Sequence, residues 1–280
     1  MPHRKVTPPL PLIEIRPDPP ALPRLLEAWK YRELLIFLAW RDVAVRYKQT
    51  ALGVFWAILQ PVLTMAIFSV IFGRLAAVPS DGLPYPLFAF CGLLPWQLFS
   101  FALGASANSL VANERLVTKV YFPRIVLPLA SVIAGLVDFA IAFLVLLALM
   151  YYYGVVPTVA ILALPAFILL AVAAATSVGV LLSAVNVRFR DVKHALPFLT
   201  QIWMLATPIA YSTSLFPEHW RPLFALNPMV GVVEGFRWAL LGRTEATAMM
   251  FAVSTAILLL GMVLSVSYFL RVERSFADVI

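Results

Sequence analysis

The chain has 280 residues, of which 62% are hydrophobic and only 12% are charged. This composition lies well outside the range of soluble domains, so it excludes a soluble globular protein. The net charge of +7 is explained by membrane-flanking loops that hold lysine and arginine beside anionic lipid headgroups. It therefore requires no nucleic-acid partner.

Residues 1–31 are expected to form a proline-rich, flexible cytoplasmic tail. Eight prolines fall within the first 23 residues, and proline opposes helix formation. Residues 1–48 also contain no uncharged hydrophobic core of the kind that a signal peptide needs. We attach no function to this segment.

An amphipathic helix is predicted over residues 32–48. Its apolar side chains recur at i, i+4, i+7 and i+11, and they are Ile36, Trp40, Val43 and Tyr47. The polar side chains project elsewhere, and they are Arg41, Asp42, Arg46 and Lys48. Of these, Asp42 and Arg46 are spaced to pair. The pattern is typical of a helix along the cytoplasmic membrane surface, with a basic anchor that has no protein partner as the alternative.

Six transmembrane helices are predicted in an all-α integral membrane protein, because a helix needs about 20 apolar residues to cross a bilayer. Their expected bounds are 50–74, 86–112, 126–152, 158–186, 195–216 and 246–270. Within the fifth, Pro197 and Pro208 are expected to break or kink the helix, so that it ends as a re-entrant segment. The single cysteine, Cys91, is expected to be a packed side chain of the second helix.

The orientation follows from the distribution of lysine and arginine, which cytoplasmic loops retain. With the N-terminus inside, only four of the 21 basic residues fall in outer segments. These four are Arg74, Arg221, Arg237 and Arg243. Both termini are therefore predicted to be cytoplasmic, in a multi-pass protein of the cytoplasmic (inner) membrane.

A short two-faced helix is predicted over residues 113–122, between the second and third spans. Its apolar side holds Leu116, Val117, Val120 and Tyr121, and its polar side holds Glu114, Arg115, Thr118 and Lys119. Pro123 stops the helix. Such a helix, clamped between long transmembrane helices, can dock into a groove of a second protein and transmit its movement, whereas an ordinary amphipathic loop is the alternative.

A second short helix is predicted over residues 228–241, on the outer side. Asn227 supplies the cap, Pro228 the first helical position, and Gly242 the stop. An apolar stripe follows the helix and consists of Met229, Val232, Val233, Phe236 and Leu240. We expect this helix to dip into the outer leaflet, with Glu234 and Arg237 paired on its wet side.

Asp138 lies near the middle of the third predicted span. A charge at that depth costs roughly 2.5–3.5 kcal/mol on insertion scales, so the side chain should face protein or water or be protonated. A structural hydrogen bond between helices is the favoured interpretation, with proton coupling as the alternative. Against proton coupling, no other ionisable residue of the sequence is expected at a similar depth.

Several sequence motifs resemble those of the ABC type-2 permeases that export cell-surface polysaccharides. The resemblance runs in order from about residue 30 to residue 280. It is carried by Arg41-Asp42, Arg46-Tyr47-Lys48, Leu52-Gly53, Trp56, Gln60-Pro61, Gly92-Leu93-Leu94-Pro95-Trp96, Lys119-Val120-Tyr121-Phe122-Pro123-Arg124, Leu127-Pro128, Arg188-Phe189-Arg190-Asp191, Asn227-Pro228-Met229 and the closing Glu273-Arg274-Ser275-Phe276-Ala277-Asp278-Val279-Ile280.

The resemblance implies a transport subunit of the O-antigen, capsule or teichoic-acid type. In that family two copies of the permease form the channel, and two copies of a separate ATP-binding cassette subunit bind ATP and magnesium and drive it. The sequence contains no G-x-x-x-x-G-K-[ST] loop, so no cofactor and no enzymatic activity are expected in this chain. The implied substrate is a glycan on a polyprenyl pyrophosphate.

The resemblance also implies roles for individual residues. Contact with the ATPase is expected at the surface helix 32–48 and at the short helix 113–122, which would be the coupling helix. The residues expected to make it are Glu114, Arg115, Lys119, Phe122 and Arg124. The anionic head group should meet Arg41, Arg46 and Lys48. A channel for sugars needs flat apolar faces with hydroxyl and amide groups, and the candidates are Trp56, Gln60, Thr64, Phe68, Phe198, Thr200, Gln201, Trp203 and Tyr211. The external gate would include Met229, Val233, Phe236 and Arg237.

Three other functions stay open on the sequence. Export of drugs or small lipids by the same family is the nearest, and an ion-coupled secondary transporter or flippase that uses Asp138 is the second. A membrane enzyme is the third, but the three histidines, His3, His194 and His219, lie far apart in the predicted topology without clustered carboxylates. No metal site is predicted.

Overall fold

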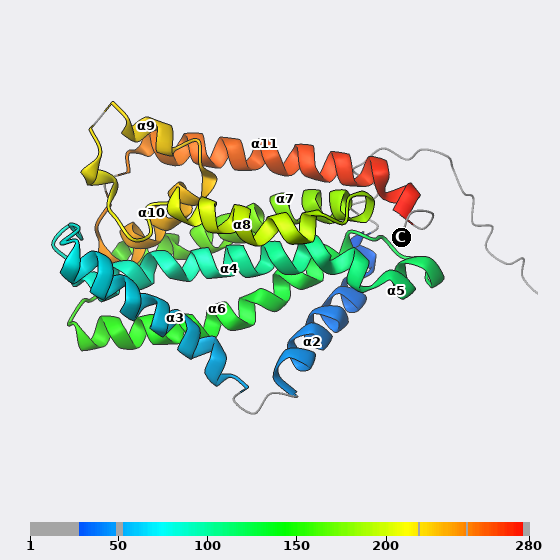
Figure 1. Cartoon of the computed structure of the whole chain (residues 1–280), viewed down its shortest axis with the longest axis horizontal. Coiled ribbons are helices and arrows are strands. Elements are labelled where there is room, and N and C mark those ends of the chain that lie inside the picture. The colour runs from blue at the N-terminus through cyan, green and yellow to red at the C-terminus, as the bar shows by residue number, and fades with distance from the viewer. Residues whose placement is uncertain (1–27, 49–52, 218, 245, 277–280) are drawn as a thin grey trace, which may run out of the picture.

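The computed structural model describes residues 28–48, 53–217, 219–244 and 246–276, and these residues form helices joined by short loops, without a strand. The first 27 residues of the expected proline-rich tail lie outside this part of the chain. Figure 1 shows α4, α7, α8 and α11 running side by side, with α2 and α3 oblique to them. The all-α prediction is therefore correct.

Five helical segments of the described residues are long and apolar enough to cross a membrane. They are α3 with the π-helical turn η1 (Phe55–Leu75), α4 (Tyr85–Ala112), α6 (Val126–Tyr152), the 3-10 turn η2 with α7 (Val159–Arg188), and α11 (Ala248–Val272) with the 3-10 turn η4 (Glu273–Ser275). α4 is the central one, since 78% of its apolar window is buried, against 6–33% in the others. It packs against α3, α6, α7, α8 and α10 (Figure 1).

The fifth expected span differs in the structure. Instead of a helix over 195–216, α8 covers Val192–Leu205, which is only 14 residues and about 21 Å long. The chain then leaves the helix at Ala206, just before Pro208, and continues through non-helical residues to the 3-10 turn η3 (Thr213–Leu215). Pro197, by contrast, lies inside α8 without ending it.

Shorter helices occupy the two ends of this bundle. α2 (Arg32–Lys48) and α5 (Glu114–Lys119) lie near the C-terminal end of α11, whereas α9 (Arg221–Phe224) and α10 (Pro228–Leu241) lie at the opposite end (Figure 1). α10 has the expected limits, because the Asn227 side chain accepts a hydrogen bond from the Met229 backbone N–H and Gly242 takes a left-handed φ of 65°.

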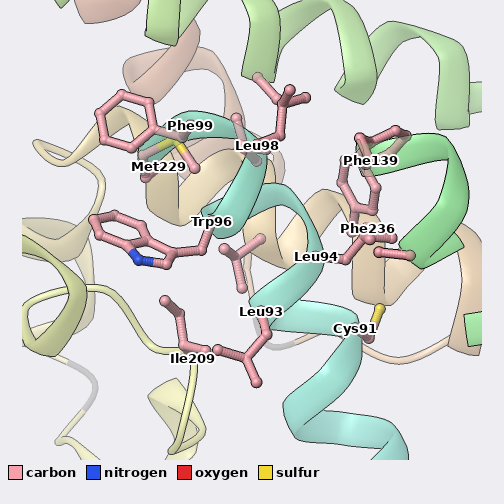
Figure 2. Close-up of a cluster of buried hydrophobic side chains, with 14 of the residues drawn as sticks. Cys91, Leu93, Leu94, Trp96, Leu98, Phe99, Phe139, Ile209, Met229 and Phe236 are labelled. Atoms are coloured by element: carbon pink, nitrogen blue, oxygen red, sulfur yellow. The ribbon is translucent and has the colours of Figure 1, made fainter. Parts of the chain in front are cut away.

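The hydrophobic core forms two clusters. The larger cluster surrounds α4 and includes side chains of α6, α7 and α10; Figure 2 shows part of it, with Phe139 of α6 beside Phe236 of α10. The smaller cluster lies at the α5 end and joins α2, α5 and the adjoining ends of α4, α6, α7 and α11. Each end of the bundle is thus held by its own apolar packing.

α4 and α7 approach each other closely where Gly179 of α7 faces Ser106 of α4. A Cβ atom added at Gly179 would lie 2.6 Å from the Ser106 Cβ. The Ser106 hydroxyl also donates to the Pro128 carbonyl at 2.7 Å, which holds that side chain in place. Small residues are what permit such close contacts between membrane helices.

Gly179→Ala is therefore expected to destabilise the protein by about 1–3 kcal/mol, because the added methyl group overpacks the α4–α7 contact. The measurement is the thermal unfolding midpoint of the purified protein in detergent. Gly104→Ala in α4 is the matched control, since its added Cβ has no atom within 4 Å and alanine favours a helix. Equal midpoints for the two variants would contradict the prediction.

Candidate functional site

A cavity of about 560 Å³ lies between α2, α3, α4 and α6. Apolar and aromatic side chains form most of its wall, and polar groups interrupt them. α2 contributes Arg46 and Tyr47; α3 and the turn before it contribute Gly53, Trp56, Ala57, Gln60, Pro61 and Thr64; α4 contributes Leu93, Leu94, Trp96, Gln97, Leu98, Ser100 and Phe101; α6 contributes Gly135, Asp138, Phe139 and Ala142; and Met204 comes from α8.

An ion pair joins two helices in the wall of this cavity. Arg46 Nη1 of α2 donates to Asp138 Oδ2 of α6, and the Tyr47 hydroxyl donates to the other carboxylate oxygen, Oδ1. The Arg46 guanidinium also lies over the Phe101 ring of α4, with its central carbon 4.0 Å from the ring centroid. Both charged side chains stay partly exposed, Arg46 by 29% and Asp138 by 27%.

This arrangement corrects two sequence predictions. Asp42 does not pair with Arg46; its Oδ1 accepts from Arg41 Nη2 at 2.7 Å instead. Asp138 is also not alone at its depth, because α2 packs against α6 and brings Arg46 to it. The interhelical hydrogen bond favoured for Asp138 is present, and it is an ion pair.

Of the predicted channel residues, Trp56, Gln60 and Thr64 lie in the cavity wall, whereas Phe68 lies outside it. Phe68 packs edge-on against Phe72. The wall formed by α4 was missed, including its polar groups Gln97 and Ser100. The signal available for it was an amide and a hydroxyl within the apolar first part of the span.

The other predicted channel residues lie on α8 or just after it, and only some of them line a hollow. Trp203 and Tyr211 line a second, more open hollow of about 800 Å³ near α9, together with Phe216, Trp220 and Phe224 among others. Phe198 and Gln201 are exposed on α8, and the Thr200 hydroxyl is used within the helix, donating to the Pro197 carbonyl at 2.9 Å.

α10 is buried along almost its whole length, with Trp238 as its one exposed side chain, which corrects the expected amphipathic helix. The predicted gate residues Met229, Val233 and Phe236 are fully buried, and Glu234 and Arg237 are each only 2% exposed. The expected pair is present, with Arg237 Nη1 3.0 Å from Glu234 Oε1. The pair does not face water, because α4, α7 and α11 pack around α10.

Further contacts hold this buried pair. Arg237 Nη2 donates to the Ile209 carbonyl at 2.9 Å, and its guanidinium lies 3.7 Å over the Phe88 ring of α4. The Thr244 hydroxyl donates to Glu234 Oε2 at 2.9 Å. Nearby, the Tyr85 hydroxyl donates to the Ala210 carbonyl at 2.5 Å. Arg237 and Tyr85 thus fix the non-helical segment that follows α8.

At the opposite end of the bundle, α5 has exposed charged side chains, while a buried apolar side chain fixes it to the smaller core cluster. Glu114, Arg115 and Lys119 are exposed. Phe122, predicted as an ATPase contact, is buried in the smaller core cluster with Val117, whereas Val120 and Tyr121, expected on the apolar side, are exposed. α5 is shorter than predicted, so the chain turns before these residues could continue its apolar face.

Arg124 holds this end to the end of α11. Its backbone N–H donates to Glu273 Oε1 at 2.7 Å, and its guanidinium donates to the Glu273 carbonyl. In the part of the chain that the structure describes, no three His, Cys, Asp or Glu side chains gather to hold a metal ion. The features available for function are therefore a partly polar cavity, an exposed charged helix and a buried α10.

Sequence relatives share most of this chain. The ABC-2 type transporter family matches residues 33–241. An O-antigen export system permease protein RfbA from Myxococcus xanthus is 36% identical over 214 residues, which cover 75% of this chain and 81% of that protein. An RfbA from Klebsiella pneumoniae is 29% identical over 206 residues (73% and 79%), and the polysialic acid transport protein KpsM from Escherichia coli is 26% identical over 206 residues (72% and 78%). With its five apolar helices, this chain is a multi-pass membrane protein that belongs to the ABC-2 type transporter family.

Proposed function

We propose that this chain is the permease subunit of an ATP-driven exporter that moves a lipid-linked cell-surface polysaccharide across the cytoplasmic membrane. The main observation that supports this proposal is the similarity, over three quarters of the chain, to a permease named for O-antigen export. The substrate class is a glycan on a polyprenyl pyrophosphate. The partners are a second copy of this chain, two ATP-binding cassette subunits that bind ATP and magnesium, and membrane lipid.

The cavity supports a path for sugars along α3 and α4. Trp56 and Phe101 offer flat faces for pyranose rings, and Gln60, Gln97 and Ser100 offer amide and hydroxyl groups. Such groups bind sugars without a closed pocket, so a polymer can slide past them. The head group would be met by Arg46 in the cavity wall and by Arg41 and Lys48 on the same helix.

A homodimer is supported by the exposure of α3, whose apolar window is only 6% buried. A second copy facing α3 would complete the channel wall and cover part of this surface, and lipid would cover the rest. In this arrangement α8 and the segment up to residue 216 cross the membrane in addition to the five apolar helices, as a helix with a re-entrant end. α10 then acts as the support of the external gate, and both termini are cytoplasmic.

Coupling to the ATPase is assigned to α5 and α2. The exposed Glu114, Arg115 and Lys119 would contact the ATPase, while Val117 and Phe122 pass its movement to the smaller core cluster as a rigid-body shift. Arg124 then acts through its bonds to Glu273 rather than by contact. Trp40 and Ile36 of α2 are exposed, which suits a helix along the membrane surface.

The test is ATP hydrolysis in lipid nanodiscs by this chain co-purified with its ATPase. A Glu114→Ala/Lys119→Ala variant is expected to lose the ATPase from the complex and the activity with it, because two of the three exposed charges of α5 are removed. The measurement is the amount of ATPase retained together with the rate of phosphate release.

Asp191→Ala/Lys193→Ala is the matched control, since it removes one acid and one base at another exposed site. It should retain the complex and the activity. Failure of any ATPase to associate with the unchanged protein would sink the proposed function, whereas an active complex with the Glu114/Lys119 variant would remove only the assignment of α5.

A further inference from the structure

The charge of the cavity depends on two side chains. Arg46 and Asp138 are the only charged residues among the described residues that line it. While they are paired, the described wall carries no net charge. An anion that enters the cavity therefore meets a guanidinium that already has a carboxylate partner.

The pair is built so that it can exchange partners. Each side chain keeps more than a quarter of its surface exposed, so a ligand in the cavity can reach the pair. An arginine has five N–H donors, and the bond to Asp138 uses Nη1. Guanidinium binds carboxylate and phosphate with the same forked geometry, so a phosphate group can take the place of the Asp138 carboxylate.

Asp138 is also held in place when Arg46 turns away from it. The Tyr47 hydroxyl donates to Asp138 Oδ1, independently of the bond from Arg46 to Oδ2. The Phe101 ring likewise supports the Arg46 guanidinium independently of Asp138. Loss of the ion pair therefore leaves each partner with a further contact.

We propose that Asp138 is an internal competitor for Arg46, which sets how tightly the cavity holds a lipid-linked diphosphate. This inference rests on the proposed function and deepens it. A transport site must bind its substrate strongly enough to admit it and weakly enough to release it. Asp138 lowers the affinity of the cavity for the anion in two ways. Its carboxylate pairs with Arg46 when the anion is absent, and it repels the anion when the anion is bound.

The test is binding of farnesyl diphosphate to the purified permease in nanodiscs, with farnesol as the uncharged comparison. Asp138→Asn keeps the size of the side chain but removes its charge, so the diphosphate is expected to bind about tenfold more tightly. Asp138→Ser is a second uncharged variant, with a smaller side chain, for the case that the asparagine amide disturbs folding. It is also expected to bind the diphosphate more tightly. Arg46→Gln is expected to lose the advantage of the diphosphate over farnesol.

Asp191→Asn is the matched control, because it removes an exposed carboxylate outside the cavity, and it should keep the original affinity. Unchanged or weaker binding by monodisperse Asp138→Asn and Asp138→Ser would overturn the proposal, and so would equal binding of farnesyl diphosphate and farnesol. Inorganic pyrophosphate that binds as tightly as farnesyl diphosphate would overturn its lipid-linked part. None of these results depends on the ATPase complex, whose formation tests the proposed function separately.

Discussion

Arg237→Met is expected to lower the free energy of unfolding by about 3–5 kcal/mol, since it leaves Glu234 as an uncompensated charge in the interior. Both side chains are only 2% exposed, so water cannot replace the lost partner. The change also removes the donor to the Ile209 carbonyl, which loosens the segment after α8. The measurement is the thermal unfolding midpoint in nanodiscs, where this variant should have the lowest value of the set.

Two further variants identify the cause. Glu234→Gln/Arg237→Met removes both charges, so it should recover much of the loss, because well-packed uncharged side chains often replace a buried ion pair at little cost. Arg243→Met is the control, since Arg243 is exposed and the same substitution there should change little. A double variant no more stable than Arg237→Met would show that the buried charge is not the cause.

The helices were largely predictable because the requirements of a bilayer are visible in composition. A run of about 20 apolar residues has few structures other than a helix available in lipid, and the predicted helix 126–152 corresponds to α6 (Val126–Tyr152). The segment 195–216 also contains no charged residue, but composition does not show where the chain leaves the helix. There the backbone after Leu205 is satisfied by contacts with distant residues such as Arg237 and Tyr85.

The site was less predictable because its key contacts are long-range. Arg46 and Asp138 are 92 positions apart, so no local spacing indicates their pairing, whereas Asp42 and Arg46 had the spacing of a pair without being one. The spacing of Glu234 and Arg237 did indicate a pair. It could not indicate burial, because that depends on three other helices packing around α10.

The cavity residues show the same limit on one helix. Trp56, Gln60 and Thr64 repeat at intervals of four, so they share one face of α3 and could be chosen together. α4 is mostly buried by its neighbours, and its amide and hydroxyl side chains are spread around the helix instead of forming one polar face. Its sequence therefore gives little sign that Gln97, Ser100 and Phe101 turn toward the cavity.

Ala57→Trp is expected to reduce polysaccharide export to the level of cells that lack this permease. Ala57 lies in the cavity wall one position after Trp56, so an indole there would occupy the space that sugar rings need. α3 is loosely covered by the rest of the chain, so the larger side chain should be tolerated by the fold. The measurement is surface polysaccharide in a deletion strain that carries the variant, normalised to permease in the membrane fraction.

Ala66→Trp provides the matched control on the same helix. Nine residues separate the two alanines, which is about 900° of helix rotation, so they lie on opposite sides of α3. Ala66 is exposed and outside the cavity wall, and export should continue in this variant. Undiminished export with Ala57→Trp would exclude the cavity from the polymer's path. Loss in both variants would instead assign the effect to the surface of α3, where we propose that lipid or a second copy lies.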